Sequence, residues 1–437
     1  MPAPCSFTEQ CKVVGTDLSQ AEALVVEASG GGMSELDEFR GEVRSFLENN
    51  APKSLLGQVS REMAYWGGRN PTLPAPESRD FCAACVERGW TAITWPKEYG
   101  GGGLSKAHER VWQQELARLA LPPPLTGFGL SMIGPTLLQF GTEEQKQEHL
   151  TKIIRGDIRW CQGYSEPNAG SDLASLATSA VLSGDEYILN GQKIWTSYGD
   201  VSDWMFCLVR TDPDVKKQMG ITFLLLDMDQ PGVEVRPIRL ISGSSPFCET
   251  FFTDARAKTR DVISGVNQGW TVAKALLGHE RTMIASLFGS ASTSSAGKGE
   301  KPKNRVVELG KEYIGLGTDG KLQDPVLRDR ITQNTMDTLS FNQTIQRNAD
   351  NVKAGHRPGP ETSIFKVYGT ELNQRREELM MSLRGSQSLG WDGEGFDSEE
   401  LAQTRTWLRS RGNTIEGGTS EVQLNIIAKR VLELPER

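Results

Sequence analysis

The sequence predicts an α+β protein of three parts, with an N-terminal helical domain, a middle antiparallel β domain and a C-terminal four-helix bundle. Apolar residues recur at spacings of three and four before residue 158 and after residue 266, which is the period of amphipathic helices. Between these regions, short apolar runs rich in β-branched and aromatic residues alternate with Gly, Asn and Pro, as in strands joined by turns.

Length, charge and composition exclude several classes of protein. The 437 residues are enough for two or three domains of about 150 residues each. A net charge of −8 without a Lys/Arg-rich block argues against nucleic-acid binding. No apolar run approaches the ~20 residues that cross a bilayer, so we expect no membrane span.

Cysteine and histidine usage points to a reducing compartment. Seven scattered cysteines, an odd number, do not form a disulfide framework, and we expect a cytoplasmic protein. The Cys82–Cys85 spacing occurs within a predicted helix over residues 81–90 and is interpreted as two buried reduced thiols. Four scattered histidines predict no metal site.

The N-terminal helical domain is expected over residues 33–158. Residues 1–32 lack the basic start and apolar stretch of a secretory signal, and we expect a disordered leader. The first helix is predicted from the spacing of Leu36, Phe39, Val43, Phe46 and Leu47. The glycine run 100–103 is predicted to be a structural turn, because no strand precedes it.

The β domain is expected over residues 159–265, with strands at 187–189, 205–209 and 221–226. Asn190-Gly191 is a strong hairpin signal. Further turns are predicted at Gly184-Asp185, Gly232 and Pro237.

The C-terminal bundle is expected over residues 266–437. Helices are predicted to begin near Val306, Asp324 and Glu361, and a last helix spans residues 420–432. The stretch near residues 290–304 is rich in Ser, Gly and Lys and has no apolar period, so we expect a mobile insertion between two helices.

Three motifs in order resemble the signatures of the acyl-CoA dehydrogenases. Residues 164–172, Tyr-Ser-Glu-Pro-Asn-Ala-Gly-Ser-Asp, resemble the first signature, and residues 188–197 resemble the flavin-facing strands that follow it. Residues 417–423, Gly-Gly-Thr-Ser-Glu-Val-Gln, resemble the C-terminal signature. The similarity runs, with gaps, from about Met33 to Pro435. It implies FAD as cofactor, an acyl-CoA substrate, an electron-transferring flavoprotein as electron acceptor, and a homo- or heterotetramer.

The resemblance assigns six residues to the cofactor. Ser165 and Ser197 match positions that hydrogen-bond the flavin, and Trp195 matches the tryptophan that packs against it, a use suited to its flat amphipathic ring. Gln162 matches a position beside Ser165 on the flavin-facing wall, and Thr419 and Glu421 match positions that face FAD. Read without the resemblance, the serines are ordinary strand-edge or turn residues and Trp195 belongs to the β-domain core.

Substrate contacts are implied for Ser171, Arg281 and Gly417. Ser171 matches the position that contacts the pantetheine arm or pyrophosphate of CoA, and the peptide near Gly417 is expected to donate to the thioester carbonyl. A helix that starts after Gly417 also favours an anion at its N-terminus; the alternative is a plain capping box of Ser420 with Gln423. Asp172 and Glu166 are expected to have structural roles.

The general base is sought in two places. Removing the β-hydrogen of an acyl-CoA as hydride requires the α-proton to leave, so a carboxylate must lie beside that carbon. In the family this base comes either from the residue before the last Gly-Thr-Ser or from the first long helix of the C-terminal domain. At the first place this chain has Gly417, which has no side chain. Glu416, one residue earlier, is the alternative base.

Glu280 is the predicted base. It interrupts an apolar stripe whose other members recur every three or four residues: Ala273, Leu277, Ile284 and Leu287. Burial on such a face would raise the pKa of a carboxyl toward the range of a useful base. The family's base-containing helix also has a Glu-Arg pair, which resembles Glu280-Arg281. The alternative is a salt bridge from Glu280 to Arg281 or Arg375.

Two departures from the family pattern leave alternative functions to consider. Residues 316–320 lack the arginine that commonly reaches a neighbouring subunit's FAD, and Leu424 replaces another usual arginine, although Arg384 is a candidate substitute. A non-catalytic or half-site subunit of a heterotetramer is therefore the first alternative. The second, an acyl-CoA oxidase, usually has a longer chain with an extra C-terminal domain. A nitroalkane oxidase would be expected to use an aspartate base.

Overall fold

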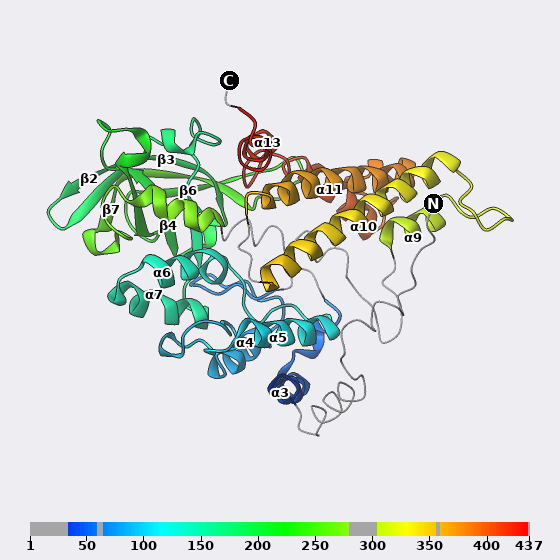
Figure 1. Cartoon of the computed structure of the whole chain (residues 1–437), viewed down its shortest axis with the longest axis horizontal. Coiled ribbons are helices and arrows are strands. Elements are labelled where there is room, and N and C mark those ends of the chain that lie inside the picture. The colour runs from blue at the N-terminus through cyan, green and yellow to red at the C-terminus, as the bar shows by residue number, and fades with distance from the viewer. Residues whose placement is uncertain (1–33, 59–63, 279–303, 355–358, 436–437) are drawn as a thin grey trace, which may run out of the picture.

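The computed structural model describes residues 34–58, 64–278, 304–354 and 359–435, and it confirms the predicted three-part order. In Figure 1, α6 and α7 lie beneath the β sheet, and the long helices α10 and α11 extend away from it to the right. The predicted leader over residues 1–32 lies outside the described residues, as does the predicted insertion near 290–304 apart from Asn304.

The N-terminal part is helical, as predicted. Its helices are α3 (Glu35–Asn50), α4 (Ser78–Glu87), α5 (Lys106–Arg118), α6 (Gly134–Phe140) and α7 (Glu143–Arg155). Helix α3 begins where the Ser34 side chain accepts a hydrogen bond from the backbone N–H of Asp37, an ordinary N-cap. The apolar stripe predicted for this helix is buried at Phe39, Val43, Phe46 and Leu47.

A buried carboxylate joins α3 to α5. Glu115 of α5 is 1% exposed and pairs with Arg40 at 2.8 Å and Arg44 at 3.0 Å, both on α3, and with Arg118 at 2.6 Å. Burial opposes ionisation of this carboxyl, but hydrogen bonds from the three arginines outweigh it and lower the pKa of Glu115 to about 2. The ionised Glu115 thus helps to hold α5 against α3.

Two local predictions in this part are confirmed. Gly100 has φ +91 and ends a short 3-10 turn, so the glycine run is a structural turn. A Cβ on Gly101 would lie 2.3 Å from the Trp95 carbonyl oxygen, which explains a residue without a side chain there. Cys82 and Cys85 are buried free thiols of α4; burial raises the pKa of Cys82 to about 12 and that of Cys85 well above its usual value.

The middle part is one seven-stranded sheet in the order β1-β4-β2-β3-β7-β6, with β5 paired to β4. The strands are β1 (Trp160–Gly163), β2 (Ser179–Ser183), β3 (Glu186–Ser197), β4 (Trp204–Arg210), β5 (Ile221–Asp227), β6 (Val233–Ile238) and β7 (Phe247–Lys258). Most pairings are antiparallel, as expected, but β1 and β4 run parallel and β2 meets β4 in a single parallel pair. The long connection between β1 and β4, which contains β2 and β3, allows a parallel pairing.

Two predicted turns of the β domain are wrong. Asn190-Gly191 does not form a hairpin, because β3 continues through it with a bulge in its pairing to β7. The Asn190 amide donates to the Asp254 carboxylate at 3.0 Å and accepts from the Asp254 N–H at 3.0 Å. These two hydrogen bonds stabilise the β-bulge. Pro237 lies within β6, where an edge strand tolerates the missing N–H. The Gly184-Asp185 turn, by contrast, joins β2 to β3 as predicted.

The apolar runs of β4 and β5 are buried on both faces of the sheet. Phe206 and Phe223 face a core shared with α6 and α7, whereas Cys207 and Leu224 face a second core against β3 and β7. Successive side chains of a strand point to opposite faces, so burial of both faces produces an uninterrupted apolar run.

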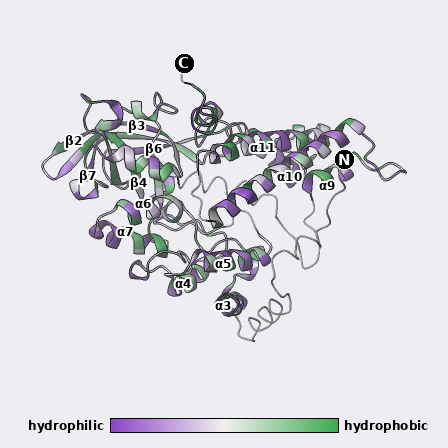
Figure 2. Ribbon diagram, viewed as in Figure 1, coloured by the Kyte–Doolittle hydropathy of each residue, from purple (hydrophilic) through white to green (hydrophobic). Residues whose placement is uncertain are grey.

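The C-terminal part is helical. Residues 269–278 are helical, followed by α9 (Arg305–Tyr313), α10 (Pro325–Lys353), α11 (Thr362–Arg384), α12 (Ser398–Ser410) and α13 (Ser420–Ile426), which continues as a π-helix over Ile427–Val431. Hydrophobic and hydrophilic residues alternate along α10 and α11 in Figure 2, as in amphipathic helices. Helix α12 was not predicted, although its Asp397/Glu400 capping box is a sequence signal for it.

A buried ion pair anchors the first motif to β3. The ammonium of Lys193, which is fully buried, lies 2.7 Å from Glu166 and donates to the Tyr164 carbonyl. Glu166 also accepts from the N–H groups of Ala177 and Thr178 at 2.6 and 2.9 Å. The structural role expected for Glu166 is confirmed, and the pair fixes the loop that contains Ser165.

We predict that Glu115→Gln destabilises the protein and removes part of its sensitivity to acid. Because the folded pKa is about 2, below the ordinary 4.5, this carboxylate stabilises the fold fully above about pH 5 and loses that effect as pH falls toward 2. We expect a loss on the order of 2–3 kcal/mol at pH 7 that shrinks on acidification. Urea unfolding followed by circular dichroism measures it. The exposed Glu87→Gln should behave as wild type, and an equal effect of both changes would contradict the prediction.

We also predict that Glu166→Gln is strongly destabilising. The substitution keeps the shape but leaves the Lys193 charge buried without a counter-charge, which typically costs about 3–5 kcal/mol. Thermal unfolding of the two proteins measures the loss. Asp172→Asn, which removes an exposed partner of Lys217, is the matched control and should change the midpoint little. A Glu166→Gln protein as stable as that control would refute the anchoring role.

Candidate functional site

The first motif and β3 form one wall of the candidate site. The Ser165 carbonyl accepts a hydrogen bond from the Ile194 N–H at 2.9 Å, so the loop after β1 lies against the end of β3. Gln162, Ser165 and Ser197 are each half-buried. The structure therefore brings Ser165 next to the segment that contains Trp195 and leaves its side chain partly accessible.

Trp195 presents its ring at the surface of this wall. Its backbone adopts φ +60, and the pairing of β3 with β7 shifts register between Lys193 and Thr196. The side chain is 53% exposed and meets the Phe247 ring edge-on at 6.1 Å. Trp195 is therefore not a core residue of the β domain. A bulky residue at positive φ is rare, and such strain typically marks a functional position.

The C-terminal motif reaches the same wall through a cation–π contact. The Arg409 guanidinium of α12 lies 5.2 Å from the centre of the Phe247 ring. Arg409 pairs with Glu416 at 2.6 Å, and Glu416 immediately precedes Gly417-Gly418. Trp195, Phe247, Arg409 and Glu416 thus form a continuous chain of contacts from the β domain to the C-terminal motif; Phe247 and Arg409 were not predicted from the sequence.

Glu416 is fully engaged by hydrogen bonds. One of its carboxylate oxygens accepts from Arg409 at 2.6 Å, and the other accepts from Asn413 at 2.7 Å. Both oxygens are thus already occupied by donors of this chain, one of them a charged guanidinium. These contacts weigh against Glu416 as the base.

Thr419, rather than Ser420, is the N-cap of α13. Its hydroxyl accepts from the Val422 N–H at 3.2 Å, so the alternative of a capping box formed by Ser420 with Gln423 is wrong. Gly417 and Gly418 both adopt positive φ, at +62 and +90, which makes glycine the favoured residue at each position. Ser420 Oγ and Gln423 Oε1 are buried and have no hydrogen-bond partner among the described residues.

The other predicted site residues are either exposed or outside the described residues. Ser171 and Glu421 are exposed. Asp172, next to Ser171, accepts from Lys217 and Ser175 at 2.5 Å each, which is a structural role. Glu280 and Arg281 fall in residues 279–303, outside the described part.

The two other arginines considered for the site have partners of their own. Arg375 pairs with Asp337 at 3.1 Å, which disfavours it as the counter-ion of Glu280. Arg384 is buried, donates to Glu399 at 3.0 Å and lies over the Tyr313 ring. Arg384 is thus committed within the C-terminal part and is not a ready substitute for the missing arginine.

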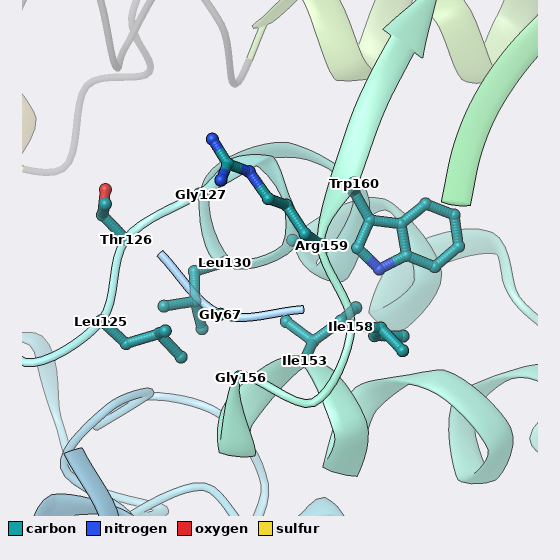
Figure 3. Close-up of a pocket in the computed structure, with 11 residues that line it drawn as sticks. Gly67, Leu125, Thr126, Gly127, Leu130, Ile153, Gly156, Ile158, Arg159 and Trp160 are labelled. Atoms are coloured by element: carbon teal, nitrogen blue, oxygen red, sulfur yellow. The ribbon is translucent and has the colours of Figure 1, made fainter. Parts of the chain in front are cut away.

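A small cavity lies on the N-terminal side of the sheet, where Arg159 and Trp160 project from opposite sides of the chain (Figure 3). Its volume of about 10 Å³ is at the lower limit for holding a single water molecule. The Arg159 guanidinium packs on the rings of Trp66 and Tyr198 at 4.5 and 5.1 Å. A cavity of this size cannot hold a thioester, so we assign it to packing.

Models of three protein-family domains match the chain in order. The acyl-CoA dehydrogenase N-terminal domain matches residues 33–157, the middle domain residues 161–255 and the C-terminal domain residues 303–432. Among the described residues, no helix is long and apolar enough to cross a membrane.

Relatives and solved structures agree with these matches. The acyl-CoA dehydrogenase IpdE1 of Mycobacterium tuberculosis is 35% identical over 403 residues, covering 92% of this chain and 99% of that protein. The solved structure of the steroid ACAD Tcur3481-Tcur3483 has a TM-score of 0.70 at 28% identity. The match covers 93% of this chain and 99% of the chain in that structure. The structure of the ChsE4-ChsE5 complex from Mycobacterium tuberculosis has a TM-score of 0.69 at 28% identity. That match covers 93% of this chain and 100% of the chain in the complex. The chain therefore belongs to the acyl-CoA dehydrogenase family of oxidoreductases, as the three motifs predict.

Proposed function

We propose that the protein dehydrogenates an acyl-CoA thioester between its α- and β-carbons, giving a trans-2-enoyl-CoA, with FAD as cofactor. The observation that carries this proposal is the exposed Trp195 ring, held at positive φ between the half-buried Ser165 and Ser197. Membership of the acyl-CoA dehydrogenase family supports the reaction class.

The residues of the wall fit a flavin. Trp195 offers an exposed aromatic face for a planar ring system, and the two serines offer hydroxyls for its polar edge. Across the junction, Ser420 Oγ and Gln423 Oε1 are buried without a hydrogen-bond partner in the described part of the chain, and a bound cofactor would provide one. We assign Gln162, Ser165, Trp195, Ser197, Thr419 and Glu421 to FAD, which when bound would supply the hydride acceptor.

Glu280 is the proposed general base. Gly417 has no side chain, and both carboxylate oxygens of Glu416 are engaged. Residues 269–278 are helical and lead toward Glu280, and Ala273 of this helix is fully buried in the shared core, as the predicted apolar stripe requires. A carboxylate that continued such a stripe would be desolvated, which would raise its affinity for a substrate proton.

The remaining substrate contacts are proposals from the motifs. The Gly417 peptide would donate to the thioester carbonyl, making the α-proton more acidic. Arg281 and Ser171 would bind the CoA part of the substrate, and the exposure of Ser171 is compatible with a contact to a long polar ligand. An electron-transferring flavoprotein as acceptor, a tetramer and a cytoplasmic location complete the proposal.

A subunit role in a heteromeric enzyme is the second candidate. Two of the similar structures have two-component names, Tcur3481-Tcur3483 and ChsE4-ChsE5. Residues 316–320 lack the expected arginine, and Arg384 is committed elsewhere. Under this alternative the chain would need a second, homologous chain to complete an FAD site.

Trp195→Ala should weaken FAD binding without destabilising the apoprotein. The half-exposed ring contributes little to the core, whereas loss of stacking should raise the dissociation constant of FAD about tenfold or more. Flavin fluorescence titration and thermal unfolding of the apoprotein measure the two effects. Leu182→Ala, on β2 and 56% exposed, is the matched control and should bind FAD normally. If the purified protein takes up FMN instead, or no flavin, the cofactor assignment fails.

Glu280→Gln should lower the rate of flavin reduction by acyl-CoA about 10²–10⁴-fold, because a positioned base is removed while shape is kept. Glu416→Gln should reduce flavin at nearly the wild-type rate. Stopped-flow bleaching with thioesters from short branched chains to steroid acyl groups measures both variants.

The opposite pattern, with Glu416→Gln inactive and Glu280→Gln active, would reverse the assignment. Full activity of both variants would place the base elsewhere. A wild-type protein that binds FAD but is bleached by no thioester would favour the subunit role, and co-purification with a homologous chain would establish it.

A further inference from the structure

Three potential metal ligands meet away from the Trp195 wall, where α7 packs against the end of the β domain. Glu148 and His149 are consecutive residues of α7, and Asp261 ends the short 3-10 turn after β7. One His149 ring nitrogen and one oxygen from each carboxylate all lie within 4.8 Å of one another. Two separate parts of the chain thus bring three ligand atoms to one point.

His149 is the unusual member of this group. It is 1% exposed, and neither ring nitrogen has a hydrogen-bond partner among the described residues. Its ring meets Trp160 and Trp204 edge-on at 5.3 and 4.9 Å, and these contacts satisfy no nitrogen. A buried imidazole without a polar partner is costly and calls for an explanation. A metal ion would accept the lone pair of one nitrogen.

An open groove gives access to the cluster. It has a volume of about 620 Å³ and is lined by Glu148, Asp261 and Trp204, among others. Arg260 also lines it, with a guanidinium nitrogen 3.4 Å from Glu148. Because the Arg260 side chain is exposed, it can turn toward solvent when a metal ion takes its place beside Glu148. The groove reaches the two carboxylates, whereas the buried His149 ring is not among its lining residues.

We propose that Glu148, His149 and Asp261 bind one divalent transition-metal ion, for which Zn²⁺ is the best fit. One imidazole and two carboxylates suit Zn²⁺ better than Mg²⁺ or Ca²⁺, which prefer oxygen ligands alone. Tetrahedral Zn²⁺ with ligands at about 2.0–2.2 Å would draw the three atoms to about 3.4 Å apart and leave a fourth position for water. The proposal departs from the sequence-based expectation of no metal site.

The ion would link the N-terminal part to the β domain. Beside the cluster, the Gln145 amide of α7 already donates to the carbonyls of Arg260 and Val262 at 2.7 and 2.9 Å. A metal held by α7 on one side and Asp261 on the other would reinforce the same junction. Its role is structural, and it does not depend on the proposed dehydrogenation.

Zinc binding by the untagged full-length protein tests the proposal. After EDTA treatment, the protein is dialysed against ZnCl₂ or MgCl₂, and bound metal is counted by mass spectrometry. Wild type should hold one zinc per chain more than His149→Gln, Asp261→Asn or Glu148→Gln, and Mg²⁺ should not replace it. Zinc far above its dissociation constant should raise the melting temperature of wild type by several degrees, because a ligand that binds the folded state stabilises it.

Two controls isolate the site. Glu144→Gln, an exposed change on the same helix, and His108→Gln, a buried histidine of α5 that contacts Ser105 at 2.8 Å, should both keep the zinc and the thermal shift. Glu148→Gln affects a partly exposed side chain and should fold even if a change at His149 does not. Wild type without bound zinc, or the three site variants binding zinc as wild type does, would overturn the proposal.

Discussion

One hydrophobic core holds three parts of the chain together, and the position of the candidate site depends on it. This core joins Ile153 of α7, Trp160 of β1 and Phe223 of β5 to Ala273 in the first C-terminal helix. Protein interiors of this kind are close-packed and hardly compressible, so they hold the attached elements in fixed relative positions. Tyr164, next to Ser165 in the first motif, and Ala273 in the helix over residues 269–278 therefore pack in the same core. A shared core of this kind holds the two segments in a fixed relation, as a base and a flavin acting on one substrate would require.

The remaining C-terminal helices depend on separate cores. Val306, Leu309, Ile331, Leu379 and Leu383 pack α9, α10 and α11 together without contributing to the shared core. Arg409 lies over the Phe247 ring, a contact between the C-terminal part and the β domain, and a partly exposed cation–π contact contributes about 0.5–1 kcal/mol. A ligand bound across this junction would stabilise it further. The buried Ser420 Oγ and Gln423 Oε1, which have no hydrogen-bond partner among the described residues, are consistent with such a ligand.

Sequence patterns predicted the regular elements well and the special backbone poorly. The stripe of α3 and the double-sided apolar runs of β4 and β5 are strong signals, because periodicity reports burial directly. Asn190-Gly191 was misread because a local turn signal cannot distinguish a hairpin from a bulge, which here depends on pairing with Asp254 of a distant strand. The positive φ of Trp195 and its contact with Phe247 have no local signal at all. Helix α12, and with it Arg409, could have been found from its capping box.

Arg409 also explains how the chain accommodates a carboxylate beside the C-terminal motif. If Glu280 is the base, a second unpaired carboxylate nearby would raise its pKa by like-charge repulsion, and would itself compete for the substrate proton. Arg409 and Asn413 engage both oxygens of Glu416 and neutralise its charge locally. The same guanidinium packs on Phe247, next to Trp195. Under the proposed function, Arg409 would therefore keep this carboxylate out of the chemistry. Gly417, which adopts positive φ and has no side chain, would let the backbone approach a thioester, and proton removal would fall to the helix that contains Glu280.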